Sequence, residues 1–373
     1  MKNPKGPTRI FVDCHVFDEG FQGTRTYIKG LYNELIADET RHFFFASVNT
    51  EILREEFGDR PNVTYLKFKS YSSIKRLLIE MPRMIRKHRI DFAHFQYRVP
   101  PLKLCKYIVT THDVLFEDFP QTFPVGERYE SSLTYWISAH MSEIVFTVSD
   151  YSRRQIQRHM RISNPVVMPN GVDSLFFEDY DKESVQAAVK KDYGLDNYLI
   201  YISRREPRKN QHLLLQYFID LKLYENQQLV LVGHKTFEDE KFDAIYNPLD
   251  ADIKKKILLI SNVAFPEIVK LLRGAQAFIY PSIAEGFGIP PLEAAAVKIP
   301  VLCSNQTAMS DFQFFGDNLF NPFDPKEFSE KLLRIATSEP NQAELETIKN
   351  TVAEKYNWRI AADIFNRELK KFE

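Results

Sequence analysis

The chain has 373 residues, 44% of them hydrophobic, which suits a globular protein with two hydrophobic cores. Its 49 lysines and arginines are balanced by 50 aspartates and glutamates, so the formal net charge of −1 does not indicate a general attraction to nucleic acid. We expect no signal peptide, because the start of the sequence is polar before one short apolar run. We expect no membrane span, because no apolar run approaches the roughly 20 residues that a bilayer requires.

The first half of the chain alternates short apolar runs with polar or glycine-containing segments, which is typical of a parallel α/β sheet. Strands are predicted at residues 9–13, 42–48, 63–68, 90–96, 106–113 and 143–149, and helices at 24–36, 73–87 and 126–142. A loop through Gly20-Phe21-Gln22-Gly23 separates the first strand from the first helix, as at the start of a doubly wound fold. The aromatic segment 116–124 is predicted to be a loop near the acceptor.

The predicted helix 73–87 interleaves basic residues with apolar ones. Such a helix could lie on an anionic membrane. The plainer alternative is a solvated face over an ordinary core face, and the interruption by Pro82 favours it on amphipathicity alone.

Asn170-Gly171 is a strong turn signal, and the connection between two domains is placed at this turn and in the polar segment 178–193 after it. The second half repeats the alternating pattern. Its predicted strands are residues 198–202, 228–232, 256–260, 277–280 and 301–303, and its predicted helices are 325–338, 341–356 and 358–372.

One strand-loop-helix unit carries the strongest chemical signal. The apolar strand 277–280 ends at Pro281, and a loop containing Gly286 and Gly288 leads to a helix expected to begin near Pro290-Pro291. The N–H groups of such a loop and helix start attract phosphate, and the glycines let a ligand approach the backbone closely. Two carboxylates flank the loop, Glu285 and, in the expected first helical turn, Glu293.

The segment Glu285-Gly286-Phe287-Gly288-Ile289-Pro290-Pro291-Leu292-Glu293 resembles the Glu-x7-Glu motif of the retaining GT-B glycosyltransferases, the nucleotide-sugar-dependent family 4. The segment Ser203-Arg204-Arg205-Glu206-Pro207-Arg208-Lys209-Asn210 is similar to a second element of that family, in which an arginine and a lysine hold the donor diphosphate. The resemblance extends over nearly the whole chain.

The resemblance implies roles for residues of the second domain. Arg204 and Lys209 would hold the diphosphate, Glu285 would lie near the transferred sugar, and Glu293 would accept hydrogen bonds from the ribose. The backbone of Gly286, Phe287 and Gly288 would contact the donor, and backbone groups at Asn262 and Val263 would bracket the base. For the two glutamates, the alternative is a surface turn and a helix cap.

In the first domain, the resemblance implies that the loop ending at Gly23 approaches the donor phosphate and that His112 contacts the donor sugar. A plain strand-to-helix turn and a histidine that caps a strand end are the alternatives without the resemblance. His94 is interpreted as a structural histidine. Ser203 and Lys298 stand where the family usually has glycine, and a left-handed Lys298 would cost on the order of 1 kcal/mol.

No metal site and no resident cofactor are expected. Asp250-Ala251-Asp252 has the Asp-x-Asp form of a metal site, but its context indicates an acidic helix start. The co-substrate would be GDP-mannose, or a UDP-sugar as the second choice. The odd number of widely spaced cysteines fits free thiols in a reducing cytosol.

The sequence thus predicts an α/β protein of GT-B architecture, with two doubly wound Rossmann-like domains facing across a cleft. The acceptor-side domain would span 1–175, the nucleotide-sugar-binding domain 176–356, and a helix at 357–373 would cross back to the first domain.

The implied function is metal-independent, retaining transfer of a hexose, mannose first, to a glycan or lipid-linked acceptor in surface polysaccharide synthesis. The enzyme would be cytoplasmic, with peripheral contact to the inner face of the membrane, and would bind no nucleic acid. The alternatives are a catalytically silent nucleotide-sugar-binding scaffold and a related isomerase or hydrolase. A covalent nucleophile role for Glu285 is the less favoured mechanism.

Overall fold

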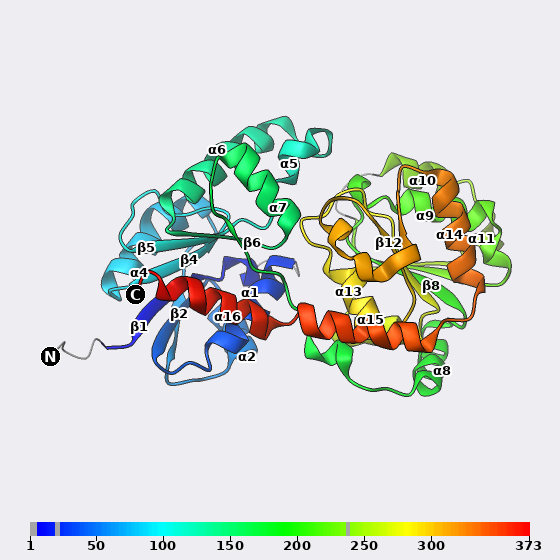
Figure 1. The fold of residues 1–373 in the computed structure, drawn as a ribbon, viewed down its shortest axis with the longest axis horizontal. Coiled ribbons are helices and arrows are strands. Elements are labelled where there is room, and N and C mark those ends of the chain that lie inside the picture. The colour runs from blue at the N-terminus through cyan, green and yellow to red at the C-terminus, as the bar shows by residue number, and fades with distance from the viewer. Residues whose placement is uncertain (1–5, 19–22, 236–238) are drawn as a thin grey trace. The chain divides into compact units, whose positions relative to one another are not determined.

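The computed structural model describes residues 6–18, 23–235 and 239–373. It divides the chain into two compact units: unit 1 extends to Gly171 and includes Trp358–Glu373, and unit 2 comprises Val172–Asn357. Each unit contains one sheet with parallel strand pairing and with helices between most successive strands (Figure 1). The prediction of two doubly wound α/β domains is therefore confirmed.

The sheet of unit 1 has the strand order β3-β2-β1-β4-β5-β6-β7. Its strands are β1 (Thr8–Asp13), β2 (Arg41–Ser47), β3 (Val63–Lys67), β4 (Phe92–Gln96), β5 (Lys106–Thr110), β6 (Ile144–Thr147) and β7 (Val166–Val167). Its α-helices are α1 (Gly23–Leu35), α2 (Thr50–Phe57), α3 (Ser73–Lys75), α4 (Met81–Lys87), α5 (Leu115–Asp118), α6 (Val125–Met141), α7 (Asp150–Gln155) and α16 (Trp358–Lys370). Short 3-10 or π turns lie at His15–Asp18, Arg76–Glu80, Pro120–Thr122 and Ile156–Met160.

Two apolar clusters fill the two faces of this sheet. On one face α1, α2 and α16 cover the strands, and Tyr32 and Phe365 are completely buried there. On the other face lie α4 and α6, whose buried residues Met81 and Ala139 belong to one apolar cluster with Phe11. Figure 1 shows α6 and α16 on opposite sides of the strands. The C-terminal helix is thus part of the hydrophobic core of unit 1.

Helices α1 and α16 approach each other at Gly30. A methyl group built on Gly30 would lie 2.0 Å from the indole Cε2 of Trp358, which is itself buried. We expect Gly30→Ala to destabilise unit 1 by about 1–3 kcal/mol, the usual cost of overpacking. Urea unfolding followed by tryptophan fluorescence measures this effect, because both tryptophans of the chain, Trp136 and Trp358, lie in unit 1.

The matched control is Gly126→Ala near the start of α6, where a methyl group would meet no atom within 4 Å. That change should be neutral or stabilising by up to about 1 kcal/mol, because alanine is the better helix former. Equal stability of the two variants would contradict the close approach at Gly30.

The sheet of unit 2 has the strand order β10-β9-β8-β11-β12-β13. Its strands are β8 (Tyr198–Ile202), β9 (Gln228–Val232), β10 (Ile257–Ile260), β11 (Ala277–Tyr280), β12 (Val301–Ser304) and β13 (Leu319–Phe320). Its α-helices are α8 (Lys182–Tyr193), α9 (Gln211–Asp220), α10 (Glu240–Tyr246), α11 (Ala251–Lys254), α12 (Phe265–Gly274), α13 (Ile289–Ala296), α14 (Pro325–Thr337) and α15 (Gln342–Lys355). Turns of 3-10 helix lie at Ser174–Phe177, Pro207–Lys209, Leu223–Glu225, Thr307–Asp311 and Gln313–Asn318.

Each sheet has one point where the strand order reverses. In unit 2 the chain adds β9 and β10 on one side of β8, and then crosses to add β11 on the other side. In unit 1 the same reversal lies between β1 and β4. Parallel sheets of this kind bind ligands at the carboxyl ends of the strands beside the reversal.

Two segments differ from the sequence-based expectation. The polar segment 178–193, predicted as a connection, contains the helix α8, which begins at its N-cap Asp181 and ends at the left-handed Gly194. The prediction was wrong because only Val189 of this helix is buried, so the segment has almost no apolar periodicity. The segment 116–124 is not an open loop, because it forms α5 and a 3-10 turn and buries Phe116.

Helical structure extends through Ser73–Lys87, as predicted. A π turn at Arg76–Glu80 precedes Pro82, which is at the start of α4 and is buried. A π turn disrupts the regular hydrogen-bond ladder just where proline cannot donate to it, which lets the helical stretch continue. No helix in the described part of the chain is both long and apolar enough to span a bilayer.

Lys298 has the left-handed conformation that glycine favours, with φ of 62°. Its ammonium group lies 2.7 Å from the Glu346 carboxylate, which partly offsets the strain. The expected backbone cost on the order of 1 kcal/mol therefore applies at this position.

Candidate functional site

Two loops meet at the reversal point of the unit 2 sheet. The first follows β8 and contains Arg204 to Asn210, and the second follows β11 and contains Pro281 to Gly288. The backbone N–H of Ile283 donates to the carbonyl of Arg208 at 2.8 Å. The side chain of Asn210 donates to the carbonyl of Pro281 at 3.1 Å. These bonds hold the two loops, 71 or more residues apart in sequence, in fixed register.

The Glu285 carboxylate is the centre of this arrangement. The Lys209 ammonium lies 2.7 and 2.9 Å from its two oxygens, and the Tyr280 and Ser282 hydroxyls donate to Oε1 at 2.8 and 2.7 Å. Only 7% of Glu285 is exposed. Burial opposes its ionisation, but the charges of Lys209 and Arg208 and these hydrogen bonds lower the pKa to about 2. Glu285 is therefore an ionised carboxylate whose lone pairs are already engaged.

A second carboxylate, Glu206, extends the network. Its two oxygens lie 3.0 Å from the guanidinium groups of Arg204 and Arg208, and Arg208 in turn lies 3.4 Å from Glu285. Arg204, Glu206, Arg208, Glu285 and Lys209 thus form a chain of alternating charges, which we call the ion-pair chain. Three cations and two anions leave it with one net positive charge, which favours an anion at this site.

The structure brings together three of the predicted residues, Arg204, Lys209 and Glu285. Sequence reasoning missed Glu206 and left Arg208 unassigned. No motif position marks Glu206, because a glutamate beside a proline in a basic turn is usually solvated. Only the fold shows that Glu206 is buried and lies between two arginines.

We expect Glu206→Gln to lower kcat/KM for a nucleotide-sugar donor by about 10- to 100-fold, the value of one or two charge-assisted hydrogen bonds. The direction of the change in kcat/KM is informative. The variant makes the site more positive, so it would bind the anionic sugar donor more tightly if charge alone mattered. Steady-state kinetics measures the effect, with Asp252→Asn as control, which removes an exposed ion pair with Lys255 at α11. An unchanged or higher kcat/KM would refute a positioning role for Glu206.

Glu293 lies in the second turn of α13, not in the first turn as predicted. The helix begins at Ile289, one residue before the two prolines, because Gly288 takes a left-handed φ of 99° and caps it. Glu293 is half-buried, and its carboxyl makes no hydrogen bond to any other described residue. Burial, with a smaller contribution from the charge of Asp173, raises its pKa to about 8. The structure therefore gives Glu293 no helix-capping role, the alternative that the sequence left open.

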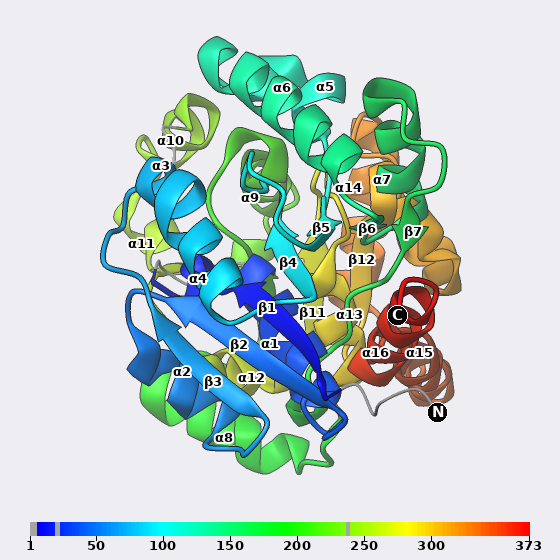
Figure 2. The ribbon, with the colours of Figure 1, turned by 90° about the vertical axis from the view of Figure 1, so that its left-hand side faces the viewer.

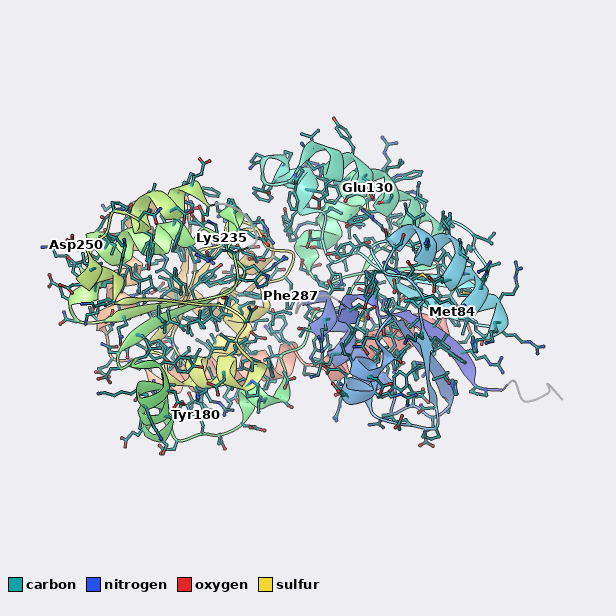
Figure 3. All side chains as sticks on the ribbon, turned by 180° about the vertical axis from the view of Figure 1, so that it is seen from behind. Met84, Glu130, Tyr180, Lys235, Asp250 and Phe287 are labelled. Atoms are coloured by element: carbon teal, nitrogen blue, oxygen red, sulfur yellow. The ribbon has the colours of Figure 1, made fainter. Side chains whose placement is uncertain are left out.

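Gly288, beside these carboxylates, has little room for a side chain. A methyl group on Gly288 would lie 3.1 Å from Met309 and 3.3 Å from Phe312, in a backbone conformation that other residues avoid. Gly286 is buried. The side chain of Phe287, labelled in Figure 3, packs edge-to-face on Phe312 and Tyr356. The predicted contact of Phe287 with the nucleotide sugar would therefore be made by its backbone.

Asn262 and Val263 follow the edge strand β10, two strands from β8. Asn262 is exposed with φ of 58°. Neither shares a hydrogen bond with the ion-pair chain among the described residues. Their predicted contact with the base stays a prediction.

Asp250 and Asp252 form the start of α11, as the sequence indicates, and Asp252 pairs with Lys255 at 2.8 Å. Figure 3 shows Asp250 and Phe287 at opposite sides of unit 2. Over the residues that the structure describes, no group of three or more His, Cys, Asp or Glu is placed to hold a metal ion.

The other predicted residues lie in unit 1. Gly23 is the first residue of α1, and a methyl group there would meet no atom within 4 Å. Gly20, Phe21 and Gln22 of the same loop lie outside the described residues. His112 follows β5, donates a hydrogen bond from Nε2 to the amide oxygen of Gln96 at 2.8 Å, and packs edge-to-face on Tyr27. Burial lowers its pKa to about 3, so the ring is neutral.

His94 is a structural histidine, as interpreted from the sequence. Its two ring nitrogens bond to the Tyr32 hydroxyl at 2.7 Å and to the Thr110 hydroxyl at 2.8 Å. One polar pair of unit 1 was missed: the buried carboxylate of Asp13, at the carboxyl end of β1, lies 2.9 Å from the partly exposed His15. The single signal for it was the position of Asp13 at the end of a strand.

Two family models match the chain: Glycosyltransferase Family 4 over residues 21–174, and Glycosyl transferases group 1 over residues 182–351. O-antigen chain mannosyltransferase B of Escherichia coli is 26% identical over 76% of this chain and 77% of that protein. O-antigen chain mannosyltransferase RfbU of Salmonella typhimurium is 25% identical over 74% and 71%. The structure of Anabaena HepE in complex with UDP-glucose is similar in fold, with a TM-score of 0.74 over 97% of this chain and 99% of that chain at 14% identity.

Proposed function

Because the chain belongs to the family 4 type of GT-B glycosyltransferases, we propose that it transfers a hexose from a nucleoside-diphosphate sugar with retention of anomeric configuration. Mannose from GDP-mannose is the first choice, since relatives over most of the chain are O-antigen mannosyltransferases. A UDP-sugar is the second choice, because HepE binds UDP-glucose.

The observation that carries this proposal is the net positive ion-pair chain at the reversal point of the sheet. When the bond between the anomeric carbon and the diphosphate oxygen breaks, the leaving group gains negative charge. Preorganised cations and backbone N–H groups stabilise that charge most in a buried setting. Lys209, Arg208 and Arg204, beside the N-terminus of α13, supply both kinds of group. We propose that they do so without a metal ion.

The state of Glu285 bears on the stereochemistry. A covalent nucleophile needs an available carboxylate, but both oxygens of Glu285 accept from the Lys209 ammonium, and Tyr280 and Ser282 occupy Oε1 further. Its lowered pKa also makes it a weak base. We therefore favour attack by the acceptor hydroxyl on the same face as the leaving group. The new carbon–oxygen bond forms as the old one breaks, and the acceptor proton passes to a phosphate oxygen.

We propose a glycan or lipid-linked acceptor in surface polysaccharide synthesis, in line with the O-antigen relatives. Such acceptors are assembled from cytosolic nucleotide sugars, so we place the enzyme in the cytoplasm. We also propose that it contacts the inner face of the membrane peripherally.

A thermal-shift series with GDP, UDP, ADP and their common sugar conjugates, all with EDTA, tests the proposal. A ligand at 100 times its Kd should stabilise the native state by about 2.7 kcal/mol, a shift of a few degrees. A GDP-selective shift followed by mannose transfer supports the proposal. Binding without transfer or donor hydrolysis would indicate a silent scaffold, and a response that requires added metal would refute metal independence.

A further inference from the structure

The outward surface of residues 67–89 in unit 1 combines two features that are rare together. Four large apolar side chains are exposed, with exposed fractions of 71% for Tyr71, 68% for Ile74, 55% for Leu78 and 42% for Ile79. The same 23-residue segment contains eight lysines or arginines and one acidic residue, Glu80, although the whole chain is nearly neutral. We call this surface the basic-apolar patch.

The exposed apolar residues are not an unfilled part of the core. The inward side of the same helical stretch is completed by Met81 and Ile85, which are buried, and by the partly buried Leu77 and Met84. Figure 2 shows α3 and α4 as one helical stretch over the strands, and Figure 3 marks Met84 on α4. The core face that the sequence predicts is therefore present, and the outward apolar residues need a separate explanation.

Most positive charges of the patch have no ion-pair partner among the described residues. Seven of its eight cations form no ion pair with another described residue, and the eighth, Arg76, lies 3.9 Å from Asp13. The carboxylate of Glu80 is engaged by the backbone N–H of Lys69 at 2.6 Å. Arg83, Arg86 and Lys87 are exposed immediately after the apolar residues. The patch therefore offers free cations around an apolar centre.

We propose that the basic-apolar patch docks unit 1 on an anionic lipid bilayer. Lysine and arginine would contact lipid phosphates, while Ile74, Leu78, Ile79 and Tyr71 would enter the boundary between headgroups and acyl chains. An acidic protein partner would satisfy the cations but not four apolar side chains among them. A second copy of this chain would place like charges together, which the absence of exposed acidic residues in the patch makes unfavourable.

The docking surface deepens the proposed function and rests on it for its purpose, since a lipid-linked acceptor is presented at such a surface. Binding itself is independent of catalysis. It can therefore be measured on the intact protein without donor or acceptor.

The chain supplies an internal control. Helix α6 also exposes large apolar residues, among them Tyr129 at 73% and Leu133 at 61%. Its charged residues are mixed, with Glu127, Arg128 and Glu130 in its first two turns. A purely apolar preference would make α6 equivalent to the patch, whereas an anionic bilayer would distinguish them.

The experiment is co-sedimentation of the full chain with vesicles of phosphatidylcholine alone or mixed with phosphatidylglycerol. We expect at least tenfold stronger partitioning to the anionic vesicles, lost at about 1 M salt, where the Debye length falls to ~3 Å. The double variants Ile74→Ser/Leu78→Ser and Arg83→Glu/Arg86→Glu should each weaken partitioning at least tenfold. Leu133→Ser should leave it unchanged, and all variants should keep the nucleotide-induced thermal shift.

Equal partitioning to neutral and anionic vesicles, or double variants that bind like the wild type, would overturn the proposal. So would size-exclusion chromatography that shows self-association abolished by the same variants, because the patch would then be an interface between copies. If the wild type shows no thermal shift with any nucleotide, that result would count against the proposed function and leave the lipid result intact.

Discussion

Replacing Lys209 with alanine should lower kcat for glycosyl transfer by about 10²- to 10³-fold, the usual effect of removing one group that stabilises transition-state charge. The Lys209 ammonium donates hydrogen bonds to both oxygens of Glu285, and the Tyr280 hydroxyl lies 3.5 Å from it. Its position is therefore fixed before the donor arrives, and no reorganisation is needed when charge develops on the leaving group. Steady-state transfer kinetics measures the loss.

The Lys209→Ala change should also lower the stability of the protein. Removing Lys209 leaves Glu285 as a buried carboxylate without its closest counter-ion, and such a change typically destabilises a protein by about 3–5 kcal/mol. The double variant Lys209→Met/Glu285→Gln removes both charges and keeps the volume. It should recover much of the stability without recovering activity.

Lys270→Ala is the matched control, because Lys270 also pairs with two carboxylates, Glu267 and Asp192, but on the outer helix α12. Its kcat should remain within about twofold of wild type, since surface ion pairs contribute little. Kinetics must be recorded well below the unfolding temperature of each variant. Transfer close to the wild-type rate by a folded Lys209→Ala protein would remove Lys209 from the mechanism.

Glu293→Gln should weaken donor binding by about 10- to 100-fold and flatten its pH dependence. The ribose hydroxyls would donate to the ionised carboxylate, yet burial raises the pKa of Glu293 to about 8. Donor binding below pH 8 must therefore release a proton. The affinity of the wild type for a nucleotide sugar should rise with pH, by at most tenfold per unit, and level off above about pH 8.

The same pKa shift has the opposite consequence for the stability of the ligand-free protein. In the unfolded chain a glutamate loses its proton near pH 4.5, whereas folded Glu293 retains its proton up to about pH 8. The free energy of unfolding contributed by this group therefore falls as pH rises through that window. Glu293→Gln should be more stable than wild type at pH 8, and the difference should shrink at pH 5.

Calorimetric titration with GDP-mannose in buffers of different ionisation enthalpy measures the proton release directly. Glu327→Gln is the control, because the pKa of Glu327 lies below its ordinary value and the residue stays ionised throughout this range. Binding by the wild type without proton release, together with an unchanged affinity of Glu293→Gln, would contradict the ribose contact.

The fold and the centre of the site were accessible from sequence because they depend on local patterns. The strand 277–280, the glycines after it and the paired prolines specify a strand, a loop and a helix within a short window. The exact helix start was not accessible, since it depends on the left-handed Gly288, where Met309 and Phe312 from a later segment leave little room for a side chain.

The remaining features depend on contacts that a linear pattern does not contain. Glu206 becomes important only because the loop after β8 folds back so that both arginines face it. Likewise, the spacing of apolar residues in helix 73–87 does not tell which of them face the core and which face solvent. The structure separates Met81, which is buried, from Ile74, which is exposed.

The position of α16 also constrains the order in which the molecule can be made. Residues up to Gly171 leave the ribosome early, but the core they form includes Phe365 and Leu369, which are completely buried in the finished unit. Unit 2 is continuous in sequence and can complete its own core first. From Gly171 to Trp358, at about 5–20 residues per second, translation takes roughly 10–40 s. During that interval we expect the nascent N-terminal half to expose the apolar surface that α16 covers in the finished unit, and a truncation before Trp358 should therefore destabilise unit 1.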